Sequence, residues 1–463
     1  MRVLISILLL ASVAHALNRP QQVRYMATTG SDANPGTAAS PWASPNHALN
    51  CGDVIIASAG TYSFSNFGNG KWGTVTCAAG NSVAWLVCAT FDACKISAGA
   101  NFAMDLDHSY WGVSGWEATT SSTGWSCFVA APPSGAVAGI HHIIFANDVA
   151  NGCGAGGFGT FSSGNFGVDY VEIIGNIAYN AAQNSTNCYS GISIFQPTKS
   201  DSAAGTHIYI AGNFSYGNLD PATCAGTAAT DGEGGILDTF DWKAAAGSSI
   251  YDQQAGMDNN IFVSNGGYGM EAQNYVTNPA THATVFRRNN TLWGNNTSSS
   301  RNATPLCAGS MVNVFYGITD TGNIDQETRS LGCATTNTIR AATKWNTSNA
   351  SGSSDSGNWY VAASGSATSA SNGDGNTFSY GTNTIGTDPA FAAPAAPGAP
   401  SCTGKASVTD CMATVIANFT PSAVGIAGKG YQPASAVNGS DQAHYPAWVC
   451  TSGLPYGLIT PNC

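Results

Sequence analysis

The sequence predicts an all-β protein built as a single parallel β-solenoid, and three observations carry this prediction. The first is a repeated block of short apolar strand, asparagine corner, second strand and further asparagine. The second is a third strand, begun by glycine or serine, that follows each block. The third is composition, because the chain has 55 glycines among 463 residues and is only 9% charged. This balance is typical of turn-rich extracellular β structure and not of a helical protein.

The repeated blocks lie in the middle of the chain. They span residues 171–180, 208–218, 257–265 and 285–295, with corner asparagines at Asn176, Asn213, Asn260 and Asn290. Asparagine tolerates left-handed backbone angles, and its amide can bond to the equivalent asparagine on the next coil. Ordinary β-turns in a sandwich would also use asparagine, but the fixed order of strands favours stacked coils.

The third strands are expected at 191–195, 235–240, 269–273 and 310–315. Coils of this length stack at about 4.8 Å, so these strands form one column. The column places the acidic stretch 231–241 beside Glu271 and Gln273. Inserts of unequal length follow it at 197–205, 242–253 and 274–281, and such inserts commonly build the walls of a solenoid's binding face.

The N-terminus reads as a secretory signal peptide. Met1 and Arg2 precede an apolar run over 3–11 and a small-residue triplet ending at Ala16, where cleavage is expected. The apolar run is too short to span a bilayer. We therefore expect a soluble, secreted protein that has no membrane partner.

All fourteen cysteines follow this segment, which predicts disulfides in an exported chain. Cys77, Cys88 and Cys94 are close enough for local bridges, and Cys450 and Cys463 are candidates for tying down the C-terminal tail. Ten Asn-x-Ser/Thr triplets suggest a glycoprotein. Some of these asparagines would instead be ladder residues inside turns, where no glycan fits.

The net charge is −11 and the pI about 4.9. This acidic balance argues against a nucleic-acid partner and against simple electrostatic capture of a polyanion. An anionic substrate would need a bound cation or a local cluster of Lys and Arg. We expect a monomer whose partner is a polysaccharide.

The N-terminal motif carries a resemblance to a known group. Residues 23–37 read Val-Arg-Tyr-Met-Ala-Thr-Thr-Gly-Ser-Asp-Ala-Asn-Pro-Gly-Thr, and Pro41-Trp42, 52–54 and 60–62 follow in order. This run resembles the N-terminal cap of secreted right-handed parallel β-helix proteins of the pectate-lyase-like superfamily, the pectin lyase fold. The resemblance implies a right-handed parallel β-helix with three-strand coils and an N-terminal capping helix, expected at 45–49.

The closing segment of the same group is similar to residues 387–391 and 418–428. The resulting division is a signal peptide at 1–16, an N-terminal cap at 17–62, and β-helix coils at 63–347. Irregular outer coils and a disulfide-tied C-terminal segment are expected at 348–463.

Four carboxylates lie within eleven residues of the acidic stretch: Asp231, Glu233, Asp238 and Asp241. The stretch resembles the calcium-cluster coil of one branch of β-helix pectate lyases. Calcium takes six to eight oxygen ligands, and the resemblance implies a calcium ion held by these side chains. The implied reaction is β-elimination in an acidic, uronate-containing polysaccharide. The basic lysine of that branch aligns with Glu271 here, so the substitute bases are Lys243, Arg287 and Arg288, with His207 and His282 behind them.

Two other function classes stay open. Asp238 and Glu271 on adjacent coils would supply the carboxyl pair that glycoside hydrolysis needs. A non-catalytic carbohydrate-binding or wall protein would use the acidic residues for calcium-based stability or for capping strands. Trp242, Tyr251 and Tyr268 flank the acidic coil and, together with Gln273, are candidates for binding sugar rings, although packing against the inserts is the alternative for the aromatic residues.

Overall fold

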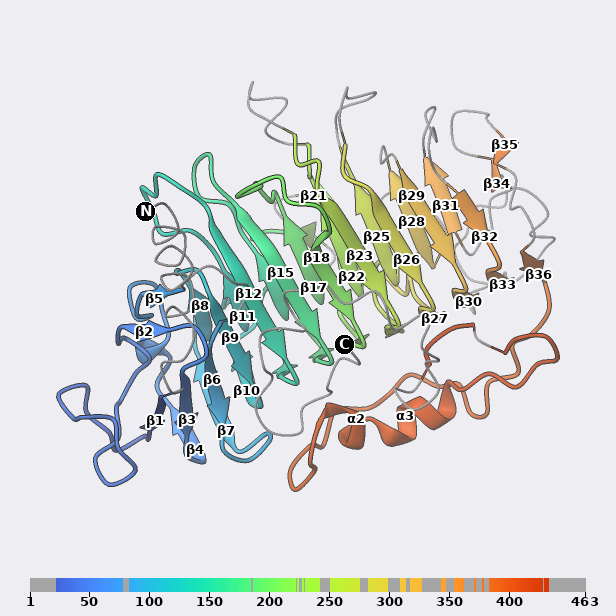
Figure 1. Cartoon of the computed structure of the whole chain (residues 1–463). Helices are drawn as coiled ribbons and strands as arrows, with labels where there is room; N and C mark the ends of the chain where they lie inside the picture. Colours follow the sequence, from blue (N-terminus) through green and yellow to red (C-terminus); the bar gives the residue numbers. More distant parts are fainter. Residues whose placement is uncertain are drawn as a thin grey trace, which may run out of the picture.

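Three long parallel sheets run the length of the molecule, and successive coils contribute one strand to each (Figure 1). The structure is a computed structural model of the chain. It describes residues 22–77, 83–184, 186–221, 223–224, 227–228, 230–241, 250–274, 282–298, 309–313, 317–326, 343–346, 354–361, 370–371, 377–378, 383–427 and 429–432.

The first sheet contains eleven parallel strands. They are β1 (Val23–Met26), β3 (Val54–Ala57), β6 (Ala84–Cys88), β9 (Trp111–Ser114), β12 (Ile140–Ala146), β15 (Val168–Ile174), β18 (Thr206–Ala211), β23 (Gln254–Asp258), β26 (Val285–Arg288), β29 (Ile318–Thr321) and β32 (Ser354–Ser356).

The second sheet also has eleven strands. They are β4 (Gly60–Tyr62), β7 (Cys94–Ala98), β10 (Trp116–Thr120), β13 (Val149–Asn151), β16 (Ile177–Tyr179), β19 (Phe214–Tyr216), β24 (Ile261–Val263), β27 (Thr291–Trp293), β30 (Ile324–Gln326), β33 (Trp359–Val361) and β36 (Thr384–Ile385).

The third sheet has eight strands and carries the acidic stretch. They are β8 (Met104–Leu106), β11 (Phe128–Ala130), β14 (Phe158–Thr160), β17 (Ile192–Phe195), β22 (Gly235–Asp238), β25 (Met270–Gln273), β28 (Ser310–Asn313) and β31 (Thr343–Asn346). The predicted column of third strands is thus confirmed, since β17, β22, β25 and β28 pair in order.

Small elements complete the described structure. Three strand pairs, β2 (Leu49–Asn50) with β5 (Val75–Thr76), β20 (Thr223–Cys224) with β21 (Thr227–Ala228), and β34 (Ala370–Ser371) with β35 (Thr377–Phe378), lie outside the long sheets. The helices are the 3₁₀ turn η1 (Phe64–Asn66), α2 (Val408–Cys411) and α3 (Ala413–Asn418).

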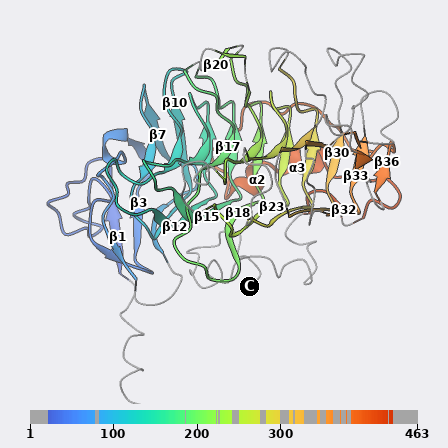
Figure 2. The ribbon, with the colours of Figure 1, turned by 90° about the horizontal axis from the view of Figure 1, so that it is seen from above.

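The core lies inside the coils, where side chains alternate inward along each strand. Inward positions such as Ile143, Phe145, Ile208 and Ile210 are fully buried in one continuous apolar cluster. Figure 2 shows the same strand positions recurring along the coil axis. Each coil buries its apolar face only by stacking on its neighbours, as expected for a solenoid.

The predicted asparagine ladder is confirmed and extends to Asn323 and Asn358. Asn213 shows the pattern: its Oδ1 accepts from the backbone N (2.9 Å) and Nδ2 (3.1 Å) of Asn176, and its Nδ2 donates to the Ile173 carbonyl (2.8 Å). The preceding residue is left-handed in each coil, with φ of 65° at Gly212 and 56° at Asn259. Glycine and asparagine accept such angles most readily, which explains their recurrence there.

A second ladder joins Asn218, Asn265 and Asn295. Asn213 and Asn295 are both sequons and both 0% exposed. The expectation that some triplets are ladder residues without room for a glycan is therefore confirmed at these two positions.

The predicted capping helix at 45–49 is wrong. Residues 45–48 are irregular and lead into β2. The Pro45 carbonyl accepts from His47 N (2.8 Å) and Gly73 N (3.1 Å), and the His47 ring stacks on Trp42 at 3.8 Å. Contacts to a neighbouring loop thus replace the helical bonds. The long sheets include β1, β3 and β4 from the predicted cap and β32, β33 and β36 from the predicted outer coils.

The C-terminal segment packs along the second sheet (Figure 1). Val408, Met412 and Phe419 join Ile177 and Phe214 in one apolar cluster. This segment covers the outer face of the second sheet, so that face is closed to a long substrate.

Five disulfides are formed among the described cysteines: Cys51–Cys77, Cys88–Cys94, Cys127–Cys153, Cys188–Cys224 and Cys402–Cys411. They fit an oxidising compartment. The predicted signal peptide, Cys450 and Cys463 lie outside the described residues. Within the described part of the chain, no helix has the length and apolar character needed to cross a membrane.

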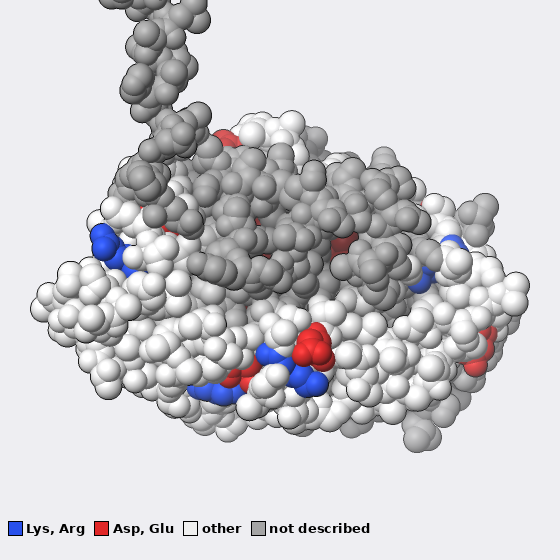
Figure 3. All heavy atoms as spheres, turned by 60° about the horizontal axis from the view of Figure 1, so that its bottom comes forward, with Lys and Arg blue, Asp and Glu red and all other residues white. Residues whose placement is uncertain are grey.

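Charged side chains are sparse on the face shown in Figure 3. Blue and red groups lie together at the lower centre of this view, and the other charged groups are scattered over the described surface. The net negative charge of the chain is therefore not gathered into one large patch on the described part of this face.

Candidate functional site

The outer face of the third sheet brings together the residues that the sequence singled out. Ile236 is in register with Glu271, and Asp238 with Gln273. Leu237 and Ala272, which alternate with them, lie in the core. Because side chains of a strand alternate between faces, Asp238, Glu271 and Gln273 share the outer face.

Asp238 is a half-buried carboxyl at the end of β22. Burial raises its pKa to about 6, against the lowering effect of the Thr239 hydroxyl, with further increases from the negative charges of Glu233 and Asp241. The Thr239 hydroxyl donates to Asp238 Oδ1 at 2.5 Å. A carboxyl with such a pKa can hold a proton near neutral pH and release it, which suits a general acid.

Thr239 makes a strained turn directly after Asp238. Its φ is 57°, and its backbone N donates to the Gln273 carbonyl at 2.8 Å. A positive φ is a rare conformation for a β-branched residue and costs about 1–3 kcal/mol. In this turn the Thr239 hydroxyl lies beside the carboxyl of Asp238.

Glu271 is buried, with 2% of its surface exposed, and is in register with Met311 on β28. Its Cα is offset from that of Asp238 by one strand and two residues, which corresponds to about 8 Å in a regular sheet. The two carboxyls therefore belong to one local surface.

The other acidic residues are held by separate partners. Glu233 is fully buried and accepts from the Ser190 hydroxyl at 2.6 Å. Asp231 accepts from the Thr230 hydroxyl at 3.0 Å, and Asp241 is fully buried. The backbone N of Asp231 donates to Asp220 Oδ2 at 3.0 Å, which anchors the start of the acidic stretch.

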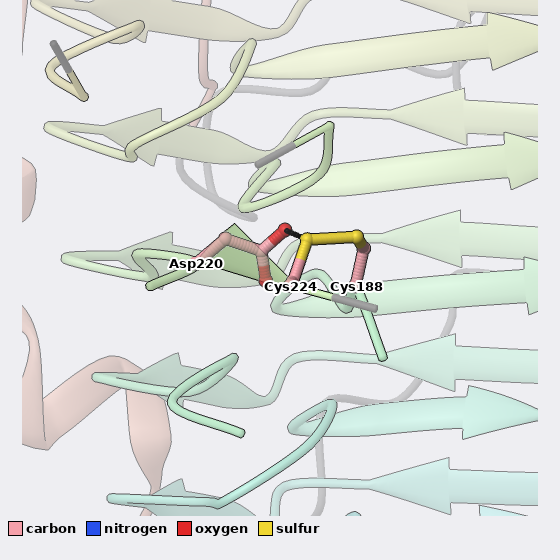
Figure 4. A group of neighbouring side chains, drawn as sticks. All are labelled: Cys188, Asp220 and Cys224. Atoms are coloured by element: carbon pink, nitrogen blue, oxygen red, sulfur yellow. Dashed lines mark hydrogen bonds between the residues drawn. A yellow bond between two sulfur atoms is a disulfide. The ribbon is translucent and has the colours of Figure 1, made fainter. Parts of the chain in front are cut away.

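The carboxylates do not converge in the manner of a calcium cage. Among the described residues, one group of three potential ligand atoms lies within 4.8 Å of one another: Cys188, Asp220 and Cys224 (Figure 4). Both of these cysteines are in a disulfide, so they offer no thiolate to a metal. No three of the described residues Asp231, Glu233, Asp238 and Asp241 have ligand atoms within 4.8 Å of one another. Calcium needs six to eight oxygens, so a calcium ion at the acidic stretch stays a prediction.

The two arginines proposed as bases are not at this site. Arg287 is 0% exposed and points into the solenoid, where its Nε donates to Asp320 Oδ1 at 2.7 Å. Arg288 lies on the first sheet, where its Nε donates to Asp258 Oδ1 at 3.0 Å. Both predictions are wrong, because Arg287 is held in a buried ion pair with Asp320 and Arg288 lies on the first sheet. Lys243 lies outside the described residues.

The aromatic residues that the sequence proposed for sugar binding are not the ones that the structure leaves half-buried near Asp238. Tyr251 and Tyr268 are 1% and 4% exposed, so they do not offer ring faces to a sugar. Trp242 lies outside the described residues. Sequence reasoning missed two half-buried phenylalanines, Phe195 at the end of β17 and Phe161 directly after β14. The available signal was that Phe195 ends the third strand just before the acidic one.

A stack of aromatic rings on the first sheet accounts for the histidines. His142 stacks on Tyr170 at 4.3 Å, and Tyr170 on His207 at 3.9 Å. His207 is 1% exposed, with Nδ1 3.0 Å from Asp169 and Nε2 3.1 Å from the Ala203 carbonyl. The Ala203 carbonyl can only accept, so Nε2 carries a proton, and a proton on Nδ1 as well would let the ring donate to Asp169. His207 thus belongs to a stack with Tyr170 and His142, whereas the Nδ1 of His282 lies 3.1 Å from the Ala283 carbonyl.

The net pKa shifts of this pair agree with an ion pair. Burial lowers the pKa of His207, but the hydrogen bond and charge of Asp169 outweigh it and the pKa lies above its ordinary value. Burial raises the pKa of Asp169, but His207 and further donors bring it below its ordinary value. His207 is therefore engaged in buried structural contacts and is not a free base.

Comparison with known proteins gives likenesses among solved structures. No family model and no curated protein matches the chain. The pectate lyase Pel9A is 15% identical, over 73% of this chain and 80% of that one, with a TM-score of 0.40. A rhamnogalacturonan lyase is 16% identical, over 88% and 99%, with a TM-score of 0.37. The catalytic unit of a GH87 α-1,3-glucanase from Streptomyces thermodiastaticus strain HF3-3 is 12% identical, over 73% and 65%, with a TM-score of 0.32.

These likenesses are too distant to carry an argument about activity. The three stacked parallel sheets and the asparagine ladders rest on the chain's own coordinates. They show that the chain is a parallel β-helix protein, and they confirm the fold that the sequence predicted.

Proposed function

We propose that this protein is a carbohydrate-active enzyme that hydrolyses a polysaccharide bound along the outer face of the third sheet. The observation that carries this proposal is Asp238, a half-buried carboxyl whose pKa is raised to about 6. Glu271, on the neighbouring strand, shares its outer face.

Hydrolysis of a glycosidic bond needs one carboxylic acid to protonate the leaving oxygen and one carboxylate to activate water or attack the sugar. Asp238 is the proposed acid. The Thr239 hydroxyl donates to Oδ1, which leaves Oδ2 to hold the proton that is transferred. Glu271 is the proposed second carboxylate. Carboxyl separations of about 5–9.5 Å serve the two stereochemical courses of this reaction, and the strand offset of the two residues falls within that scale.

Calcium-assisted β-elimination of an acidic polysaccharide is the second candidate. Lys344 on β31 is in register with Met311, which is itself in register with Glu271. A lysine therefore lies two strands beyond Glu271 in the same sheet, and abstraction of a proton from a uronate needs such a base. Calcium stays a prediction for this candidate.

The products distinguish these candidates. The protein is incubated with neutral glucans and xylan, and separately with polygalacturonate and alginate. New reducing ends without ultraviolet absorbance of an unsaturated sugar support hydrolysis, whereas that absorbance on a polyuronate supports elimination. Loss of activity in chelator and its return with calcium would support a metal. Activity on none of these polymers would contradict both enzyme proposals and leave a binding role.

A further inference from the structure

We infer that the substrate is a neutral polysaccharide that lies along the coil axis, with sugar rings stacked on Phe161 and Phe195 beside Asp238. This inference deepens the proposed hydrolysis and rests on it for the role of Asp238. It names a substrate class and two binding residues that the sequence did not reveal.

One column of the third sheet carries the argument. Phe195 is in register with Asp238, and Asp238 with Gln273. The column continues at the positions of Asn313 and Asn346 on β28 and β31. Aromatic rings therefore lie on one side of the carboxyl and carboxamide positions on the other. A polymer lying across the strands would meet them in sequence.

The rings form a row that extends away from Asp238. The centroids of Phe195 and Phe161 are 6.5 Å apart, those of Phe161 and Phe102 are 6.1 Å apart, and those of Phe102 and Trp125 are 5.3 Å apart. Trp125 is 39% exposed and the three phenylalanines are half-buried. A ring that is packed on one side and open on the other is held in place and can stack on a sugar. A continuous group of half-open rings beside a carboxyl is the kind of surface on which sugar rings stack.

Charge selects a neutral polymer for this row. The eight strands of the third sheet contain three acidic residues, Asp105, Asp238 and Glu271, and one basic residue, Lys344 on β31, whereas the strands from β8 to β28 that carry or adjoin the rings and Asp238 contain no Lys or Arg. A polyuronate brings one carboxylate per sugar and would be repelled by such a face. Lys199 and Arg288 lie elsewhere and are paired with Asp252 and Asp258. Stacking and amide hydrogen bonds suit uncharged sugars.

Binding to the Asp238→Asn variant of the full chain tests this inference without turnover. Calorimetry and affinity electrophoresis are run with xylan, neutral β-glucan, α-glucan and polygalacturonate. We expect at least one neutral polymer to bind more tightly than polygalacturonate. Adding Phe161→Ala or Phe195→Ala should weaken that binding by about 3- to 10-fold, as loss of a stacked ring does.

Phe286→Ala is the matched control, because Phe286 is a half-buried phenylalanine on the outer face of the first sheet. It should leave binding unchanged, and circular dichroism checks the fold of each variant. Tighter binding of polygalacturonate, no binding of any neutral polymer, or equal effects of Phe161→Ala, Phe195→Ala and Phe286→Ala would each overturn the inference.

Failure of the inference and failure of the proposed hydrolysis are separable. If wild-type protein cleaves a neutral polymer but Phe161→Ala and Phe195→Ala bind as the control does, the stacking role is wrong and hydrolysis stands. If Asp238→Asn retains full cleavage while the phenylalanine variants lose binding, the catalytic role is wrong and the stacking role stands.

Discussion

Two regions of the coils share one backbone register but differ in their side chains. One is the row of asparagine corners between the first and second sheets, and the other is the outer face of the third sheet. The corners hold the same residue coil after coil, from Asn176 to Asn358, and each amide bonds to its equivalent. The third-sheet column changes at every coil, from Phe195 to Asp238 to Gln273. A position that repeats builds the scaffold, and a position that changes while the register continues is free to serve binding or catalysis.

The same contrast appears in how polar groups are satisfied. Asn213 is fully buried, and its amide makes bonds with the coil before it and the coil after it. Asp238 is half-buried, and its described side-chain hydrogen bond comes from the adjacent Thr239. Removing the amide of Asn213 should therefore lower stability, and removing the carboxyl of Asp238 should lower activity.

The largest expected effect is on turnover. Asp238→Asn should lower kcat on the cleaved polymer by about 100- to 10,000-fold, because an amide cannot donate the acid's proton. Its melting temperature should stay close to that of the wild type, because the residue is only half-buried. Steady-state kinetics and a thermal melt measure both. Unchanged kcat would remove Asp238 from the mechanism.

The next effect is on the fold. Asn213→Ala removes the side-chain bonds to Ile173, Asn176 and Asn260 and leaves buried polar groups unsatisfied. Each such group costs about 1–3 kcal/mol, so the free energy of unfolding should fall by about 3–6 kcal/mol. Chemical denaturation measures this, with Asn101→Ala at an exposed position as the control. Similar stability of the two variants would mean that the ladder does not hold the coils.

The next effect is on the pH dependence of activity, which should change by about tenfold for each unit of pH. Burial raises the pKa of Asp238 to about 6, so the proton donor is present below that pH and lost above it. Activity limited by this acid should fall about tenfold for each unit of pH above 6. A profile of kcat/KM from pH 4 to 8 measures the fall. Activity that instead rises through this range would point to Asp238 acting as a base.

The difference between the two regions also decides what the sequence could predict. The coils and ladders were predictable because Asn176, Asn213, Asn260 and Asn290 repeat in a fixed order. The sequence also placed Asp238 and Glu271 on adjacent strands. Their shared face was not predictable, because alignment of the strands at residues 235 and 269 puts the two side chains on opposite faces, whereas in the structure Gly235 pairs with Met270 and Ile236 with Glu271.

Features that depend on contacts between coils were not predictable. The carboxylate that pairs with Arg287 is Asp320, 33 residues further along the chain, and no periodicity links the two. The segment at 45–49 has helix-like spacing, but the Pro45 carbonyl bonds to Gly73 instead. Burial of Tyr251 depends partly on Asp169, which accepts from its hydroxyl at 2.7 Å across 82 residues.

The smallest expected effect is on stability, at the ladder position where an aspartate stands in place of the repeated asparagine. Asp148 occupies the ladder position one coil before Asn176: its N donates to Asn176 Oδ1 (2.8 Å), and its Oδ1 accepts from Trp116 N (2.9 Å). It is 0% exposed, and no described hydrogen bond reaches Oδ2. Burial raises its pKa well above the ordinary value, against the lowering effect of bonds from backbone N–H groups.

Asp148→Asn should therefore stabilise the protein at pH 8 by about 1–2 kcal/mol. The folded carboxyl keeps its proton while the unfolded one releases it above an ordinary pKa of 3.8. The stability that the Asp148 carboxyl contributes is therefore complete below pH 3.8 and declines as the pH rises toward the raised pKa of the folded state. An amide has no such penalty, and by register its Nδ2 would reach the Val113 carbonyl, as Asn176 reaches Phe145. Melts at pH 4 and 8, with exposed Asp388→Asn as control, should show the gain at pH 8 alone. An equal gain at both pH values would assign it to the new hydrogen bond and not to the cost of keeping the folded carboxyl protonated.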